Sequence, residues 1–188
     1  MKKIAIVHHS GYGHTQRQAE AVAAGARRVA NTEVHLLGVD KMDDAFWATL
    51  AAADAIVFGA PTYMGSLSAP FKTFMEASSK VWFTQGWQDK LAAGFTCSAS
   101  QSGDKLNALQ QLSVFAAQQA MLWVSLGLLP GNNSSTGSVQ DLNRLGSYLG
   151  AMAQANADQG ADAMLQSDLD TAAHLGRRVA EMAQRFAA

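Results

Sequence analysis

Short apolar runs alternate along this chain with segments whose apolar residues recur at helical spacing, and this alternation limits the possible folds most strongly. We expect strands at 4–7, 34–37, 55–59, 91–96 and 121–126. The expected helices carry apolar residues at 19–29, cover 43–53, and begin near 68, at 104 and at 167. Apolar runs without polar alternation are typical of parallel strands covered on both faces. The sequence therefore predicts an α/β fold, a doubly wound parallel sheet with helices on both faces.

Composition limits the size and class of the protein. The chain has 188 residues, 48% of them hydrophobic, which suits a single domain over 1–188. A net charge of −1 supplies no long-range field, so we expect no nucleic-acid partner. Cys97 is the single cysteine, which excludes an internal disulfide and fits a reducing compartment. About five apolar residues follow Lys3, too few for a signal peptide or membrane span, so we expect a cytoplasmic protein without membrane insertion.

The first expected strand ends in the sequence HHSGYGHT, whose residues 10–15 are called the first loop. Its two glycines permit a tight turn, and the helix start that follows offers free N–H groups to an anion. The loop predicts a phosphate site. It is not a nucleotide-triphosphate loop, because His14-Thr15 stands where a Lys-Ser/Thr pair is required. A dinucleotide fingerprint also fails, because no third glycine follows before Gly25.

Two further loops follow strands and carry unusual side chains. The second loop, residues 60–66, reads APTYMGS, and the third loop, residues 97–103, reads CSASQSG. In open α/β sheets the ligand lies at the carboxyl ends of the strands, so the three loops are expected to converge. The first loop offers a phosphate site without a cation. The second offers an aromatic ring and a thioether that can contact a flat ligand ring, and the third offers small hydroxyls that can bond the polar edge of that ring. This combination suits flavin mononucleotide (FMN).

These motifs carry a family resemblance. The residues are SGYGHT at 10–15, GAPTYMG at 59–65, Val81-Trp82, and SASQ at 98–101. The chain resembles the flavodoxin-like family, most closely the WrbA-type FMN-dependent NAD(P)H:quinone oxidoreductases, from Met1 to about Leu126. It departs from them in a third loop with less Gly and Thr, and in Gln118-Gln119 where the family has tandem histidines.

The resemblance implies a five-stranded sheet in the order 2-1-3-4-5, FMN as cofactor, NAD(P)H as electron donor, a quinone or similar acceptor, and a homo-oligomer (a dimer or tetramer). It implies no catalytic side chain, because flavin N5 carries the chemistry. The implied FMN-binding residues are Ser10, Gly11, Tyr12, Gly13, His14, Thr15, Pro61, Thr62, Tyr63, Met64, Gly65, Cys97, Ser98, Ala99, Ser100, Gln101, Ser102 and Gln118. Tyr12 and Trp82 would line the substrate opening.

Several alternatives remain open. A one-electron carrier of flavodoxin type would need an acidic docking face, which 15 acidic and 14 basic residues do not supply overall. A non-redox docking protein would keep the fold without the cofactor. We expect no metal, because His8 and His9 point to opposite faces of a strand.

Other residues have two interpretations. Cys97 is a small buried residue or a nucleophile. Trp82 belongs to the core or the opening. Trp87 is favoured as a core residue, although we also expect Trp82, Phe83 and Trp87 close together near the rim of the opening. Arg144 faces solvent or meets a nicotinamide phosphate. Residues 127–138 are longer than a strand-helix loop requires, and we expect them to overhang the flavin cleft.

Overall fold

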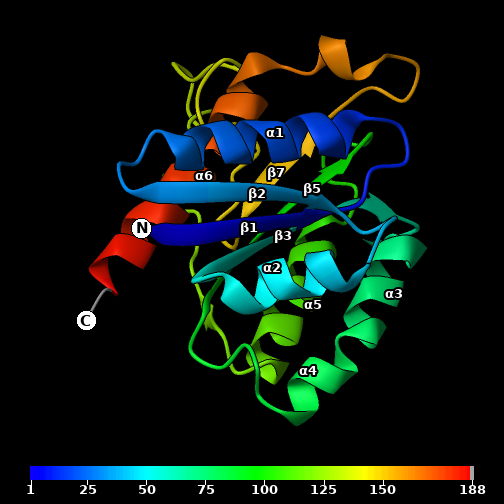
Figure 1. Cartoon of the computed structure of the whole chain (residues 1–188). Helices are drawn as coiled ribbons and strands as arrows, with labels where there is room; N and C mark the ends of the chain where they lie inside the picture. The colour runs from blue at the N-terminus through cyan, green and yellow to red at the C-terminus, as the bar shows by residue number, and fades with distance from the viewer. Residues whose placement is uncertain (187–188) are drawn as a thin grey trace.

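The computed structural model describes residues 1–186 and contains one twisted sheet between two layers of helices (Figure 1). The strands are β1 (Lys2–His8), β2 (Thr32–Gly38), β3 (Ala55–Tyr63), β4 (Ser66–Leu67), β5 (Leu91–Ser98), β6 (Leu122–Trp123) and β7 (Ala151–Gln154). The main strands stand in the order β2-β1-β3-β5-β6, which confirms the predicted order 2-1-3-4-5. Their pairings are parallel, and β4 adds a short antiparallel hairpin to β3.

The helices cover both faces of the sheet, as predicted. They are α1 (His14–Arg27), α2 (Asp44–Ala52), α3 (Ala69–Ala77), α4 (Ser79–Phe83), α5 (Lys105–Gln118) and α6 (Gln166–Arg185), with a 3-10 turn, η1, at Ala161–Ala163. Apolar residues of α1 and α6 pack on one face, and those of α2, α3 and α5 on the other (Figure 1). The α1 and α6 backbones meet at Gly25, where a Cβ would lie 1.8 Å from the carbonyl oxygen of Ala173.

The fifth sheet position holds two short strands rather than one. β6 pairs with the start of β5, whereas β7 pairs with residues 95–98 at its end. Between them the chain leaves the sheet over residues 124–150, called the excursion below. The predicted strand at 121–126 is therefore wrong in extent, and β7 was not predicted. A strand divided by an excursion leaves no continuous apolar run in the sequence.

The last helix begins at Gln166 rather than at the predicted capping sequence one residue later. No side chain caps it, because the two expected capping residues make tertiary contacts. The Ser167 hydroxyl donates to the carbonyl of Val139 at 2.7 Å, and the Asp168 carboxylate pairs with Arg144. The capping pattern thus predicts where this helix starts, but its Ser167 and Asp168 side chains bind residues of the excursion instead of capping the helix.

Candidate functional site

A cleft of about 1090 Å³ opens at the carboxyl ends of β1, β3 and β5. All three predicted loops line it, together with one segment that was not predicted. The lining residues are Ser10, Gly11, Tyr12, His14, Thr15, Pro61, Thr62, Tyr63, Met64, Gly65, Cys97, Ser98, Ala99, Ser100, Gly103, Asp104, Ala155, Ala157, Asp158 and Gln159. The convergence expected from the order of strands and loops is therefore present.

The first loop turns the chain into α1 and leaves the start of that helix open. Gly13 has a φ of 89°, in the left-handed region that glycine adopts without strain, and its N–H donates to the Ser10 hydroxyl at 3.1 Å. No side chain of the described residues caps α1, and its first turn holds no acidic residue. The first residues of this helix, His14 and Thr15, line the cleft, so its first N–H groups lie beside the cleft without a side-chain cap.

The second loop places the ring of Tyr63 against the ring of Tyr12 in the first loop. The Tyr63 and Tyr12 rings meet edge to face with centroids 6.4 Å apart. A Cβ on Gly11 would lie 2.5 Å from the Tyr63 hydroxyl, so glycine is required for this approach. Burial raises the pKa of that hydroxyl. The Thr62 hydroxyl points instead into the sheet, 2.8 Å from the hydroxyl of Thr96.

The third loop is held by a lysine that lies beneath it. Lys105 at the start of α5 is fully buried, and its ammonium donates to the Ser98 hydroxyl and to the carbonyls of Ser100 and Gln101. Cys97 at the end of β5 is a small buried residue, 4% exposed. Burial raises the pKa of its thiol to about 12, so it is a thiol and not a thiolate nucleophile at neutral pH.

Residues 155–159 complete the cleft and were not predicted as part of it. The His14 ring nitrogen Nε2 lies 2.9 Å from the carbonyl oxygen of Gln159, which ties this segment to the first loop. The segment follows β7 and therefore leaves the same edge of the sheet as the other loops. Because β7 has no recognisable sequence run, nothing in the sequence marked the residues after it as cleft residues.

Comparisons with known proteins agree with this geometry. Residues 29–133 match the family described as NADPH-dependent FMN reductase. The chain belongs to this family. It is similar to flavodoxin FldP of Pseudomonas aeruginosa, with 43% identity over 99% of both chains. An NAD(P)H dehydrogenase (quinone) of Aromatoleum aromaticum is 32% identical, over 96% of this chain and 95% of that one. A WrbA-like flavodoxin structure from Agrobacterium tumefaciens is 44% identical, with a TM-score of 0.79, over 98% of this chain and 99% of that one.

The resemblance to WrbA-type flavodoxin-like proteins is thereby confirmed, as is the reductase type of enzyme. The donor groups of the cleft fit the FMN of this family. An uncapped helix start and hydroxyls suit a phosphate. Tyr63 and Met64 offer flat and polarisable surfaces to a ring, and the third loop offers polar groups to its edge.

Five predicted site residues are absent from the lining of this cleft. Gly13, Gln101 and Ser102 belong to loops that reach it, whereas Trp82 and Gln118 do not reach it within one chain. Trp82 and Gln118 line a second hollow of about 260 Å³, between α3, α4 and α5. The expectation that the neighbouring tryptophans and Phe83 gather at the cleft rim is also wrong. Trp87 is 1% exposed and packs in the aromatic core. Trp82 and Phe83 lie on α4, which follows α3 at the end of the molecule opposite α1 (Figure 1), and neither residue lines the cleft.

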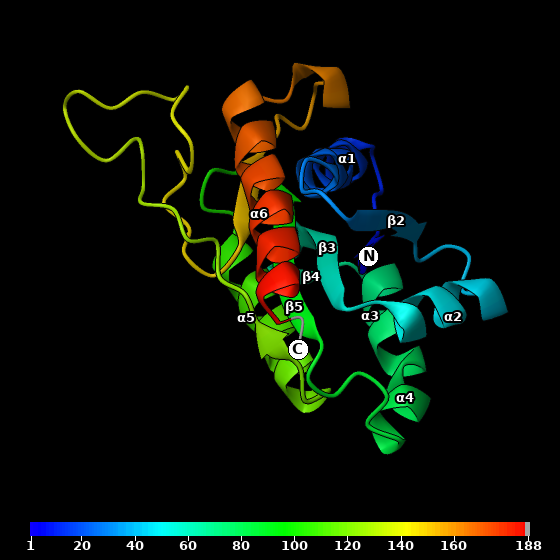
Figure 2. The ribbon, with the colours of Figure 1, turned by 60° about the vertical axis from the view of Figure 1, so that its left-hand side comes forward.

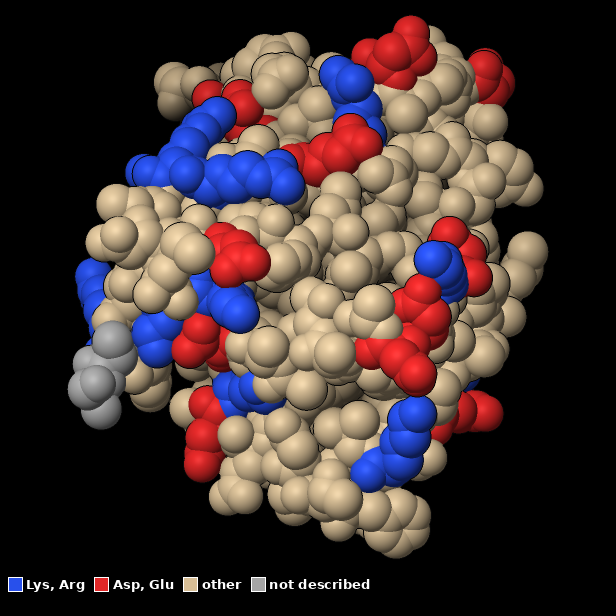
Figure 3. Space-filling view, in the orientation of Figure 1, with Lys and Arg blue, Asp and Glu red and all other residues tan. Residues whose placement is uncertain are grey.

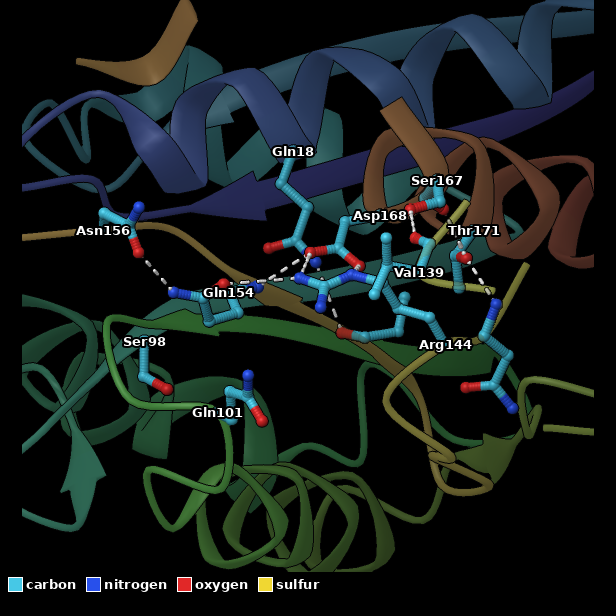
Figure 4. Close-up of polar contacts among 12 residues, drawn as sticks. Gln18, Ser98, Gln101, Val139, Arg144, Gln154, Asn156, Ser167, Asp168 and Thr171 are labelled. Atoms are coloured by element: carbon cyan, nitrogen blue, oxygen red, sulfur yellow. Dashed lines mark hydrogen bonds and ion pairs between the residues drawn. The ribbon is translucent and has the colours of Figure 1, made fainter. Parts of the chain in front are cut away.

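The excursion does not overhang the cleft, contrary to expectation. None of residues 127–138 lines it, and Figure 2 shows the excursion projecting from the side of the sheet, with α6 between it and α1. Arg144 neither faces solvent nor is free for a nicotinamide phosphate. Its side chain is 5% exposed and pairs with Asp168 of α6, as Figure 4 shows.

The histidines near the first loop are engaged separately. His8 bonds the Gln16 amide oxygen and His14 bonds the Gln159 carbonyl. Burial lowers the pKa of His9. Over residues 1–186, no three His, Cys, Asp or Glu side chains are grouped as a metal site would require. Over the same residues, no helix has the length and apolar character needed to cross a bilayer.

Proposed function

We propose that the protein is an FMN-dependent oxidoreductase that takes two electrons from NAD(P)H and delivers them to a quinone or a similar small acceptor. One observation carries the proposal: the uncapped start of α1 opens at the edge of a cleft that is also lined by Pro61, Tyr63 and Met64. FMN, when bound, supplies the carrier for the electron pair. The protein binds it, orients it and limits access to it.

The phosphate end of FMN would be held by the first loop. The Ser10 and Thr15 hydroxyls and the first N–H groups of α1 are the donors present there. No lysine or arginine lines the cleft, so the helix dipole and these hydrogen bonds take the place of a cation. Residues 157–159 bound the same end, which favours a terminal phosphate over a dinucleotide.

The ring of FMN would lie between the second and third loops. Tyr63 and Met64 would contact its flat face, and the polar groups of residues 98–100 would contact its edge. Tyr12 is 80% exposed beside Tyr63 and stands where donor and acceptor rings enter. The two substrates would use this opening in turn. The relative named as a quinone dehydrogenase supports a quinone as the acceptor.

A one-electron carrier is the second candidate, favoured by the flavodoxin name of a relative with 43% identity. Carriers dock through a surface of one charge sign. Figure 3 shows acidic and basic side chains interspersed on the face drawn, and the net charge is −1. We therefore place the reductase first. A non-redox docking protein ranks third, because such a protein does not need an open anion site beside a cleft. We also propose a cytoplasmic homo-oligomer.

Equilibrium dialysis of the purified protein against FMN and against FAD tests the cofactor. We expect FMN to bind at least tenfold more tightly, because the phosphate end accepts a terminal phosphate and is bounded by residues 157–159. Equal or tighter binding of FAD would reject this site. Absence of binding of either flavin would instead favour the docking protein.

A further inference from the structure

Lys105 is buried with its ammonium group fully hydrogen-bonded, which is rare for a lysine. It is the first residue of α5 and is 0% exposed. Its Nζ lies 2.7 Å from the Ser98 hydroxyl oxygen, 2.8 Å from the carbonyl oxygen of Ser100 and 2.7 Å from that of Gln101. The three N–H donors of the ammonium thus meet three acceptors of the third loop. Buried charges of this kind are retained where hydrogen bonds compensate the lost hydration.

These bonds fix the direction of the loop backbone. In a trans peptide the N–H points opposite to the C=O, and the described residues contain no cis peptide. Because the carbonyls of Ser100 and Gln101 point inward at Lys105, the N–H groups of Gln101 and Ser102 point outward. Ser98 and Ser100, which accept from Lys105 through a hydroxyl and a carbonyl, line the cleft, whereas Gln101 and Ser102 are not among its lining residues.

We propose that Lys105 is a positioning residue which holds the cleft-lining residues Ser98 and Ser100 in place for the edge of FMN and puts one buried positive charge behind that edge. The proposal rests on the proposed function. Two electrons and one proton, transferred as hydride from the proposed donor NAD(P)H, would add one negative charge to the ring of bound FMN. A nearby positive charge stabilises that form more than the oxidised form, so Lys105 raises the affinity of the site for reduced FMN relative to oxidised FMN.

The charges around Lys105 leave its own charge effective at neutral pH. Burial lowers its pKa to about 8, the carboxylate of Asp168 on α6 opposes this decrease, and Arg144 of the excursion adds to it. Asp168 is already paired with Arg144, at 2.8 Å. Cys97 keeps its proton, since the pKa of its thiol is about 12. Lys105 therefore carries its charge at pH 7 and loses it as the pH rises through about 8.

Three variants test the proposal. Lys105→Met removes the charge and the donors, and Lys105→Arg keeps both. Lys90→Met is the matched control, because the half-buried Lys90 also donates to two backbone carbonyls, those of Ala51 and Ala53. Lys90 directly precedes β5, at the edge of the sheet opposite the cleft.

Binding of oxidised and reduced FMN is the first readout. At pH 7 we expect Lys105→Met to bind oxidised FMN at least tenfold more weakly. We also expect its preference for reduced FMN to fall about tenfold, which for a two-electron couple lowers the midpoint potential by about 30 mV. Lys105→Arg and Lys90→Met should stay within about threefold of the unsubstituted protein. Equal affinities and potentials in Lys105→Met and Lys90→Met would overturn the proposal.

The pH dependence decides the role of the charge even where Lys105→Met does not fold. We expect the unsubstituted protein to lose preference for reduced FMN between pH 7 and pH 9, and Lys105→Arg to keep it, because arginine does not titrate there. Parallel pH profiles for the two proteins would contradict the proposal.

Hydrogen exchange separates this proposal from the proposed function. If the unsubstituted protein binds no FMN, the proposed function is wrong, yet the loop can still be tested without ligand. Faster amide exchange at 98–104 in Lys105→Met than in Lys90→Met would support Lys105 as the residue that holds the loop. Equal exchange would overturn it.

Discussion

Arg144 and Asp168 form a bidentate ion pair inside the protein, with Arg144 Nε and Nη2 each 2.8 Å from a different Asp168 carboxylate oxygen. The side chains are 5% and 2% exposed. Asp168 also accepts from the Gln154 N–H, and the Gln154 amide donates to the carbonyl of Ala99 in the third loop. The Asp168 carboxylate thus joins the excursion, α6 and β7, and Gln154 of β7 extends this network to the third loop of the cleft (Figure 4).

Loss of this pair should destabilise the protein strongly. Arg144→Met leaves a buried carboxylate without its cation, which costs about 3–5 kcal/mol of the free energy of unfolding. Urea denaturation measures the change. Arg177→Met is the control, because Arg177 and Glu181 form an exposed pair at 3.8 Å, worth less than about 1 kcal/mol. Equally small changes in the two variants would show that the pair is not structural.

Loss of a phosphate-binding hydroxyl should weaken FMN binding without blocking turnover. Each charge-assisted hydrogen bond contributes about 1.5–3 kcal/mol, so we expect Ser10→Ala or Thr15→Ala to lower FMN affinity about ten- to a hundredfold. Turnover at saturating FMN should persist. Thr49→Ala is the control, since its hydroxyl bonds only the Ala45 carbonyl on α2. FMN affinities unchanged from this control would remove the first loop as the phosphate site.

The surface of α4 should take part in self-association. Trp82 and Phe83 are 38% and 78% exposed, and their ring centroids lie 4.9 Å apart. An apolar pair beside a hollow is rarely left open to water. We expect the unsubstituted protein to be a dimer or tetramer in light scattering, and a Trp82→Ala, Phe83→Ser double variant to shift toward monomer without a large loss of melting temperature. A monomer in the unsubstituted protein would contradict this.

Cys97 should resist alkylation until high pH. Because burial raises the pKa of its thiol from 9.0 to about 12, the folded protein at pH 8 holds roughly a thousandfold less thiolate than the unfolded chain. We expect iodoacetamide to react slowly, with a rate that keeps rising above pH 9, and at the ordinary rate in guanidinium. The folded thiol keeps its proton where the unfolded thiol loses it, so stability relative to Cys97→Ala should fall as the pH rises above about 9. A rate that levels off near pH 9 in the folded protein would contradict the burial.

The sequence predicted the parts of the fold that follow from continuous patterns. The alternation of strands and helices and the three loops after β1, β3 and β5 follow from residues that are adjacent in sequence, whereas the strand order was implied by the family resemblance. β7 and residues 155–159 were missed because β7 completes a strand position begun before the excursion, and only tertiary pairing with β5 defines it.

Side-chain partners were the least predictable. Arg144 and Asp168 are separated by 24 residues, and neither sequence neighbourhood indicates the other. Lys105 stood beside the predicted helix start at 104 as an ordinary charged residue. Its burial depends on the third loop folding over it, which spacing and composition do not encode. Trp82 and Gln118 were carried over from the resemblance, and this chain holds them at the second hollow.

Anaerobic mixing of the FMN-loaded protein with NADPH, followed by addition of a soluble quinone, tests the central claim most directly. We predict that the yellow colour bleaches within one turnover time and returns stoichiometrically when the quinone is added, because the opening beside Tyr12 admits both substrates in turn. Slow or absent bleaching by NADPH in a protein that binds FMN tightly would contradict a reductase and favour the one-electron carrier.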